Sequence, residues 1–198
     1  MIPNTDATFR RVVILVALLN LAYFGIEFGV GLRIGSVSLF ADSIDFLEDT
    51  SMNVLIVAAL TWSAVNRSRV GMVLAGILLV PSVAALWQAW QKFITPLPPA
   101  AVALSLVASG ALVVNLSCAL LLARFRSHSG SLTRGAFLSA RNDAIANVAI
   151  IVAGFLTAYS RTGWPDLIVG LGIITLNAGA AVEVWKAARQ EYGEAKAA

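Results

Sequence analysis

Long apolar runs separated by short polar segments dominate this chain of 198 residues. The first run extends from Val12 to Leu32, which is long enough to cross the roughly 30 Å hydrocarbon core of a bilayer and too long for a cleavable signal peptide. Charged residues make up only 13% of the sequence, whereas hydrophobic residues make up 59%. Because a soluble domain carries about 25% charged residues, the sequence predicts an all-α integral membrane protein.

Six transmembrane helices are expected. The apolar runs place them at residues 12–32, 37–65, 70–90, 101–123, 135–159 and 164–185, with Gly35 and Ser36 forming the first turn. Only about a dozen residues follow residue 185, which is too few for a soluble domain. We therefore expect one six-helix transmembrane domain over residues 1–198, without a carboxy-terminal cytoplasmic domain.

The basic residues indicate which way the helices cross the membrane. Ten of the 14 Lys and Arg residues fall on the side of the two termini, and three fall on the opposite side. By the positive-inside rule, we expect a multi-pass protein of the cell (inner) membrane with both termini cytoplasmic. The basic residues separate apolar runs instead of clustering on one surface, so nucleic-acid binding is not expected.

Four polar side chains interrupt the second apolar run on a single helix face. At 100° per residue they fall within about 80° of one another: Asp42, Asp45, Asp49 and Asn53. Glu48 lies beside this face. A charged side chain near the bilayer centre costs about 2.5 to 3.5 kcal/mol on insertion scales. A bound cation or a relay of protons would offset that cost.

The fifth apolar run carries a matching polar face, because Ser139, Asp143 and Asn147 recur at every fourth residue. Asp143 could join Asp45 and Asp49 in binding a divalent cation through carboxylate oxygens. Ser139, Asn147 or a water could complete four ligands. The alternative is a buried polar network that only fixes helix packing. Since bunched carboxylates raise one another's proton affinity, metal ions and protons should compete for this site.

The first helix has a polar stripe of its own, made of Asn20, Tyr23 and Glu27. Glu27 is a second acid inside a span, and it either serves function directly or reaches the outer interface as a snorkelling side chain. Gly25 and Gly29 are spaced for close contact with another helix.

No motif indicates an enzyme or a prosthetic group. The single cysteine, Cys118, has no second thiol for a disulfide or a Cys-rich metal site, so a packing role is expected. The single histidine, His128, lies in a basic loop, where a histidine is more often solvated than a ligand. The sequence contains no nucleophile and base pair, Gly-rich phosphate loop or cofactor motif, so a membrane enzyme is the least favoured class.

Four segments, in order along the chain, resemble the cation diffusion facilitator family of six-helix metal exporters, which includes zinc transporters. They are GSVSLFADSIDFLED at residues 35–49, VNLSCALLLAR at 114–124, NDAIANVAIIVAG at 142–154 and GWPDLIVGLGI at 163–173. The run from Asn20 and Glu27 onward is also similar. The resemblance implies that Asp45 and Asp49 are metal ligands of the second helix, and that Asp143 is the ligand aspartate of the fifth.

The chain departs from the family pattern at a ligand position. Ser139 stands where the family has a histidine, four residues before Asp143, so the four proposed ligands are all oxygen donors. Such a set favours harder ions such as manganese or iron(II), with zinc and cobalt still in the expected class. The proposed metal ligands are Asp45, Asp49, Asp143 and Ser139, with Asn147, Asp42, Glu27 and Asn20 as accessory candidates.

Two further positions are charged where the family is small or apolar, namely Arg141 and Glu48. An arginine inside a span is costly unless it is paired, so a salt bridge between these two side chains is one interpretation. The other is that Arg141 snorkels to the cytoplasmic surface.

Together these features predict a transporter that exports divalent metal ions from the cytoplasm in exchange for protons, by alternating access. Its partners would be a divalent transition metal ion as substrate, protons and the lipid bilayer, with neither nucleic acid nor a prosthetic group. A homodimer is one candidate assembly, although the expected lack of the family's carboxy-terminal metal-binding domain weakens the case for it. The alternative function is a non-transporting membrane subunit that pairs with a full-length family member.

Overall fold

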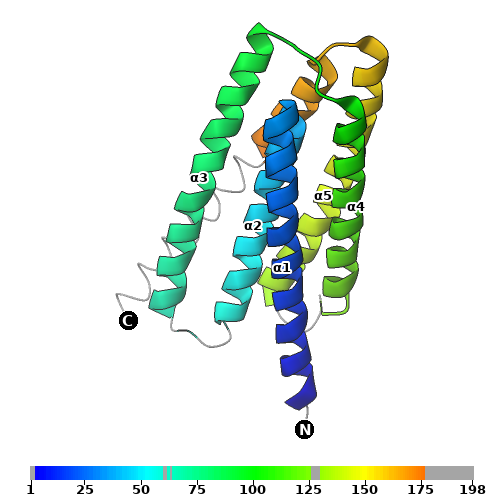
Figure 1. The fold of residues 1–198 in the computed structure, drawn as a ribbon. Helices are drawn as coiled ribbons and strands as arrows, with labels where there is room; N and C mark the ends of the chain where they lie inside the picture. Colours follow the sequence, from blue (N-terminus) through cyan, green and yellow to red (C-terminus); the bar gives the residue numbers. More distant parts are fainter. Residues whose placement is uncertain (1–2, 60–61, 63, 126–129, 177–198) are drawn as a thin grey trace.

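The computed structural model describes residues 3–59, 62, 64–125 and 130–176, and every regular element within these ranges is a helix (Figure 1). The labelled helices are α1 (Pro3–Ile34), α2 (Val37–Ala59), α3 (Ala64–Ile94), α4 (Ala101–Ala123) and α5 (Gly130–Ser160). A shorter helix, Trp164–Leu176, follows α5 and is called the Trp164 helix below. The expected all-α fold is therefore confirmed for the described part of the chain.

Three of the expected membrane spans are supported by the described residues. The segments Ala7–Ile34, Ala101–Ala123 and Ala136–Ser160 are long and apolar enough to cross a bilayer. The expectation of six spans is not confirmed. The acidic α2 and the longer α3 have 23 and 31 residues, and the Trp164 helix reaches only Leu176 before the described residues end.

The boundary between the second and third helices differs from expectation. α2 ends at Ala59 instead of near residue 65, and α3 begins at Ala64 instead of residue 70. The segment from Asn66 to Arg69, expected as a loop, therefore belongs to α3. Polar residues are compatible with a helix where it extends beyond the hydrocarbon core, so the end of an apolar run does not mark the end of the helix.

The turn between α1 and α2 forms as expected from its Gly-Ser sequence. Gly35 adopts a positive φ of 65°, which glycine tolerates without a steric penalty, and the Ser36 N–H donates to the Gly31 carbonyl at 3.0 Å. The Ser36 hydroxyl oxygen then accepts the Leu39 N–H at 3.2 Å. This bond is an N-cap, so one short turn ends α1 and starts α2.

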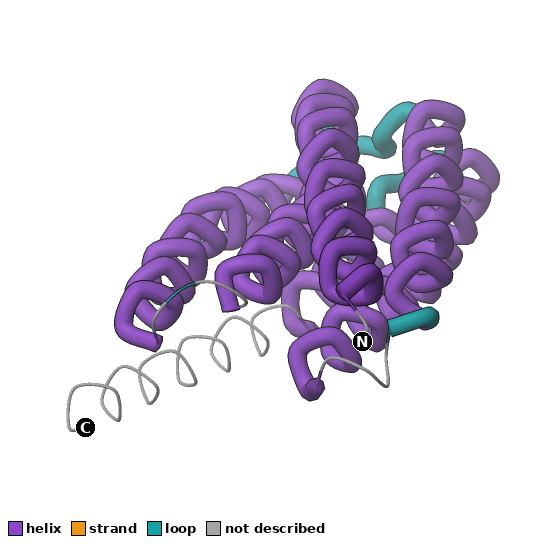
Figure 2. The backbone as a smooth tube through the Cα atoms, turned by 90° about the horizontal axis from the view of Figure 1, so that it is seen from below, coloured by secondary structure: helices purple, strands orange, loops and turns teal. Residues whose placement is uncertain are grey.

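Four helices form the centre of the bundle. α1 packs against α2 and α4, and α5 packs against α4 and α2, whereas α3 contacts α2 alone among the labelled helices. Seen along the bundle (Figure 2), α3 lies at one edge. Residues 35–36, 95–100 and 161–163 connect consecutive helices at the end opposite the start of α1, which is called the distal end below (Figure 1).

Two separate apolar clusters fill the bundle. The distal cluster includes Val37, Phe40 and Leu104, together with Ile150 and Leu167. The other cluster joins the first turns of α1 and α5 to the last turns of α2 and α4: Phe9, Val13, Val16, Ile56, Cys118, Ala119, Leu122, Ala136 and Ala140. The polar faces of α2 and α5 lie between these two clusters along the chain. Cys118 is fully buried and unoxidised in this packing, as expected.

Close helix contact occurs at a glycine that differs from the predicted pair. A Cβ added to Gly170 would lie 2.8 Å from the Ser38 backbone nitrogen and 2.7 Å from a Val37 methyl carbon. A Cβ at Gly25 or Gly29 would meet no described atom within 4 Å. The prediction for the α1 glycines was therefore wrong over the described residues, and close contact instead brings the Trp164 helix against the start of α2.

Candidate metal site

The polar face of α2 points into the bundle along its whole length. Asp42 and Asn53 are 0% and 1% exposed, and Asp45 and Asp49 are 8% and 2% exposed. The Asn53 amide donates to the Asp49 backbone carbonyl at 2.7 Å. This bond is to the backbone of α2 and not to the Asp49 carboxylate. One Asp49 oxygen, Oδ1, has no hydrogen-bond partner within the described ranges. The periodicity of α2 therefore predicted its buried face correctly.

The matching face of α5 meets that of α2 at a cavity of about 270 Å³. The side chains that surround it come from α2, α5 and the Trp164 helix: Asp45, Glu48, Ser139, Asn142, Asp143, Ala146, Ile173 and Leu176. Of the four proposed ligands, three line this cavity. The fourth, Asp49, interacts electrostatically with Asp45 and Asp143, and its carboxylate lies within hydrogen-bonding reach of Ser139.

The carboxylates are near one another but do not converge on one point. Among the described residues, no three side chains of the His, Cys, Asp and Glu types are placed so that they could hold a metal ion together. An ion held by Asp45, Asp49 and Asp143 would therefore require these side chains, or the helices that carry them, to move from their present positions.

Three of the accessory candidates fall into a second group. The Asn147 amide donates to both oxygens of Asp42, at 3.1 and 2.9 Å, and to the Asp143 carbonyl at 2.7 Å. The carboxyl of Glu27 lies against that of Asp42. Glu27 is fully buried, so the interpretation that it snorkels to an interface is wrong.

Asn20 contacts a different neighbour. Its side-chain oxygen accepts a weak bond from the Cys118 Sγ at 3.7 Å, and its amide nitrogen has no partner among the described groups. The Tyr23 hydroxyl donates to the Val107 carbonyl of α4 at 2.6 Å. The polar stripe on α1 is therefore divided, with Asn20 and Tyr23 bonded to α4 and Glu27 directed to α2.

The salt bridge between Arg141 and Glu48 is not formed. The Arg141 side chain is exposed, and its guanidinium donates to the neighbouring Asn142 at 3.3 Å. Glu48 instead lines the cavity as an additional carboxylate. Its position beside the acidic face was the sequence signal for this, whereas nothing in the sequence pattern distinguished Asn142.

A third buried carboxylate group lies at the distal end. Asp166 lies in the first turn of the Trp164 helix. An acid in the first turn favours the N-terminus of its own helix, which predicts a cap there, but Asp166 accepts the backbone N–H groups of Val37 and Ser38, at 2.9 and 3.2 Å, and so caps α2. It also accepts the hydroxyls of Ser36 and Ser38, both at 2.6 Å. The buried Lys92 of α3 interacts electrostatically with it and donates to the Gly35 carbonyl.

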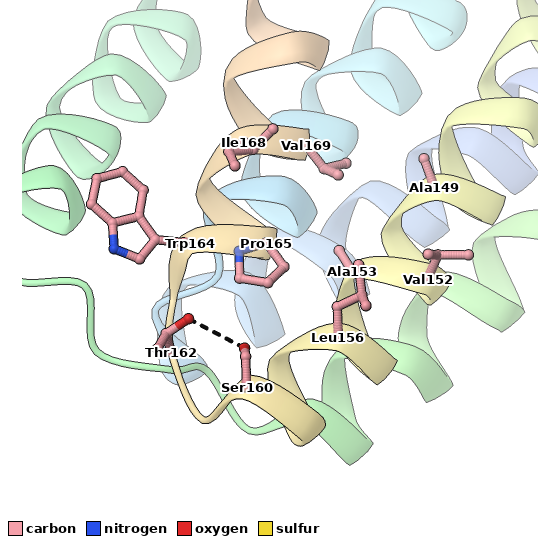
Figure 3. A pocket seen from close by; sticks show the side chains of 10 residues that line it. All are labelled: Ala149, Val152, Ala153, Leu156, Ser160, Thr162, Trp164, Pro165, Ile168 and Val169. Carbon is pink, nitrogen blue, oxygen red and sulfur yellow. Dashed lines mark hydrogen bonds between the residues drawn. The ribbon is translucent and has the colours of Figure 1, made fainter.

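A larger groove elsewhere has no comparable chemistry. About 450 Å³ in volume, it lies between α5 and the Trp164 helix, and Figure 3 shows mainly apolar side chains along it, such as Val152 and Ile168. Its two hydroxyls, of Ser160 and Thr162, bond to each other at 3.2 Å. No charged side chain of the described residues lines this groove, so it has no carboxylate that could bind a metal ion.

The sequence pattern of the cation efflux transmembrane domain matches residues 13–191. No curated protein matches the chain at a significant level. The family match covers α1 from residue 13 onward, α2 to α5 and the Trp164 helix, which contain both carboxylate groups between the apolar clusters and the Asp166 cap. Given this match over most of its length, the chain is an integral membrane protein that belongs to the cation efflux family of transporters.

Proposed function

We propose that this protein exports divalent transition metal ions from the cytoplasm in exchange for protons, by alternating access around Asp45, Asp49 and Asp143. The observation that carries the proposal is the shared cavity of Asp45 and Asp143, which come from two helices and lie beside Asp49. Carboxylates inside a membrane protein are costly unless a counter-charge accompanies them. A divalent cation that enters the cavity would supply that charge.

The donor atoms set the class of ion. The four proposed ligands are three aspartates and Ser139, which lies beside Asp49. All four offer only oxygen atoms. A ligand set made only of carboxylate and hydroxyl oxygens suits manganese and iron(II) better than a set that includes a histidine nitrogen does. We therefore place Mn²⁺ and Fe²⁺ first among the substrates, followed by Co²⁺ and Zn²⁺.

Proton exchange follows from the same carboxylates. When the metal ion leaves, two or more buried acids remain close together. Their mutual repulsion and burial favour the protonated form, so protons would take the place of the metal ion. Binding of the next ion would release those protons. The exchange thus links metal movement in one direction to proton movement in the other.

Alternating access is supported by a difference between the distal end of the bundle and the proposed metal site. The distal end is held by Asp166 and its four hydrogen bonds, whereas the proposed ligands do not yet converge on an ion. We propose that ion binding draws α2 and α5 together and that this movement releases the distal end.

Metal flux into vesicles that contain only this purified protein tests the proposal. Mn²⁺, Fe²⁺, Co²⁺ and Zn²⁺ would be compared under an imposed pH gradient with an acidic vesicle interior. We expect Mn²⁺ uptake to exceed that of empty vesicles and to slow when an ionophore collapses the gradient. The double variant Asp49→Asn/Asp143→Asn is the control for leakage.

Two results would contradict the proposal in different ways. Metal binding by the pure protein without any flux would favour the non-transporting subunit. Flux that does not respond to the pH gradient would remove the proton exchange and leave metal transport in place.

A further inference from the structure

Resting on the proposed transport of divalent ions, we propose a second cation-binding station formed by Glu27, Asp42 and Asn147. It would bind a divalent metal ion through two carboxylates and one amide oxygen. It lies on the distal side of the site formed by Asp45, Asp49 and Asp143, and so extends the path of the ion through the bundle.

The station is built by three helices. Glu27 comes from α1, Asp42 from α2 and Asn147 from α5, and all three side chains are fully buried. Asp42 contacts both of the others, through the two bonds from the Asn147 amide and through the adjoining Glu27 carboxyl. Asp42 therefore lies between Glu27 and Asn147 in the buried interior of the bundle.

Acceptor atoms exceed donors at this point. The Asn147 side-chain oxygen Oδ1 lacks a partner in the described structure, and apart from the Asp42 carboxyl within hydrogen-bonding reach, no described group is placed as a donor to either oxygen of Glu27. Tyr23, one turn away on α1, donates its proton to the Val107 carbonyl instead. A buried acceptor without a donor destabilises the folded protein, and more so when it is charged. A cation between Glu27 and Asp42 would satisfy their carboxylate oxygens, and rotation of the Asn147 amide, which now directs its nitrogen to Asp42, would turn its oxygen toward the same ion.

The charge of the group matches a divalent ion. Two carboxylates in contact carry two negative charges when ionised, which one divalent ion neutralises. The group would be stable as a packing network only if its acceptors had donors, as the carboxylate of Asp166 does. The adjoining carboxyls of Glu27 and Asp42, with no other donor at Glu27 among the described residues, need a proton or a cation between them, and in the proposed station a cation takes this position.

The position of the station suits a path. Asp42 precedes Asp45 by three residues, which is about 4.5 Å along the axis of α2 toward the distal end. Asp45 interacts electrostatically with both Asp42 and Glu27. An ion released from Asp45 toward the distal end would thus meet Asp42 before it reached the distal apolar cluster.

The decisive experiment removes the first site and asks whether a second one remains. Mn²⁺ binding to the purified Asp49→Asn/Asp143→Asn variant would be followed by electron paramagnetic resonance of the free ion. We expect residual binding, weaker than in the parent, which the added Glu27→Gln substitution weakens by about tenfold or more. Tyr23→Phe in the same background is the matched control on α1, and it should leave the residual binding unchanged.

The outcomes separate this inference from the proposed function. No residual Mn²⁺ binding, or residual binding that Glu27→Gln leaves unchanged, would overturn the second station. If proton release but no residual metal binding depended on Glu27, the pair would carry protons, and the metal station would again be excluded. Parental affinity in the Asp49→Asn/Asp143→Asn variant would instead contradict the site of the proposed function.

A second measurement covers the case in which the double variant does not fold. With the first site intact, Glu27→Gln should slow Mn²⁺ flux by about tenfold while the Mn²⁺ affinity changes little, because the first site keeps its own ligands. Glu27→Asp retains the carboxylate and should recover part of the flux. Flux at the parental rate in Glu27→Gln would overturn the inference without reference to the double variant.

Discussion

Asp166 and Asp49 are both carboxylates buried in the same bundle, but their surroundings are opposite. Asp166 accepts four hydrogen bonds from the first residues of α2, and Lys92 lies nearby. Among the described residues, Asp49 has one oxygen without a partner, only the Ser139 hydroxyl lies within hydrogen-bonding reach of its carboxylate, and its charged neighbours are other acids. The two buried acids therefore differ in the number of hydrogen-bond donors around them. The donor-rich group stabilises a helix junction, whereas we propose that the donor-poor group binds a cation.

The largest effect should follow removal of a donor-poor carboxylate. Asp49→Ala or Asp143→Ala should reduce metal flux to the level of empty vesicles. Each substitution removes one ligand and one negative charge, so both the coordination of the metal ion and the compensation of its charge are weakened. The protein should remain folded, since the substitution also relieves repulsion between acids. Flux and thermal unfolding of the same preparations measure the two effects. Thr157→Val, another buried polar position on α5, is the control, and parental flux in Asp49→Ala would refute the site.

Removal of the donor-rich carboxylate should act on stability instead. Asp166→Ala leaves two backbone N–H groups and two hydroxyls without their acceptor, and should destabilise the protein by about 3 kcal/mol. Thermal unfolding in detergent would show a lower midpoint than for Asp49→Ala. Equal midpoints for the two variants would remove the distinction between the two kinds of carboxylate.

A smaller change should follow when a nitrogen ligand is added to the donor-poor group. Ser139→His places an imidazole one turn before Asp143, where the family has its histidine. Zinc affinity relative to manganese should then rise by about tenfold, because zinc binds imidazole readily. Calorimetry with both ions tests this, with Ser139→Asn as a control of similar polarity. An unchanged ratio would mean that position 139 does not face the ion.

The smallest effect is expected at the two charges that do not pair. Arg141 is exposed and bonded to Asn142, while Glu48 lines the cavity. The stability changes of Arg141→Leu and Glu48→Leu should therefore add within about 0.5 kcal/mol in the double variant. A thermal unfolding cycle measures this, and a coupling well above that value would restore the salt bridge.

The sequence predicted those parts of the fold that depend on local chemistry. The Gly35–Ser36 turn and the limits of α4 match expectation, because a left-handed glycine, a capping serine and a proline-rich loop act within a few residues. The buried face of α2 followed from its spacing. The start of α3 was misplaced, because a helix can continue beyond the lipid.

Features that depend on contacts between helices were harder to predict. Nothing in the local sequence shows that Asp166 would cap α2 instead of its own helix, since the contact joins residues about 130 positions apart. The same limit applies to the pairing of Glu27 with Asp42 and to the close contact at Gly170. His128 and the end of the last expected span lie outside the described residues.

The position of a bound metal ion tests the central claim most directly. Crystals of the purified protein grown with Mn²⁺ would be measured at the manganese absorption edge, so that anomalous scattering locates the ion independently of the protein atoms. We expect the strongest peak between α2 and α5, within coordination distance of Asp45, Asp49 and Asp143. A strongest peak away from these three carboxylates, or no peak inside the bundle, would contradict the assignment of the donor-poor carboxylates to a transported cation.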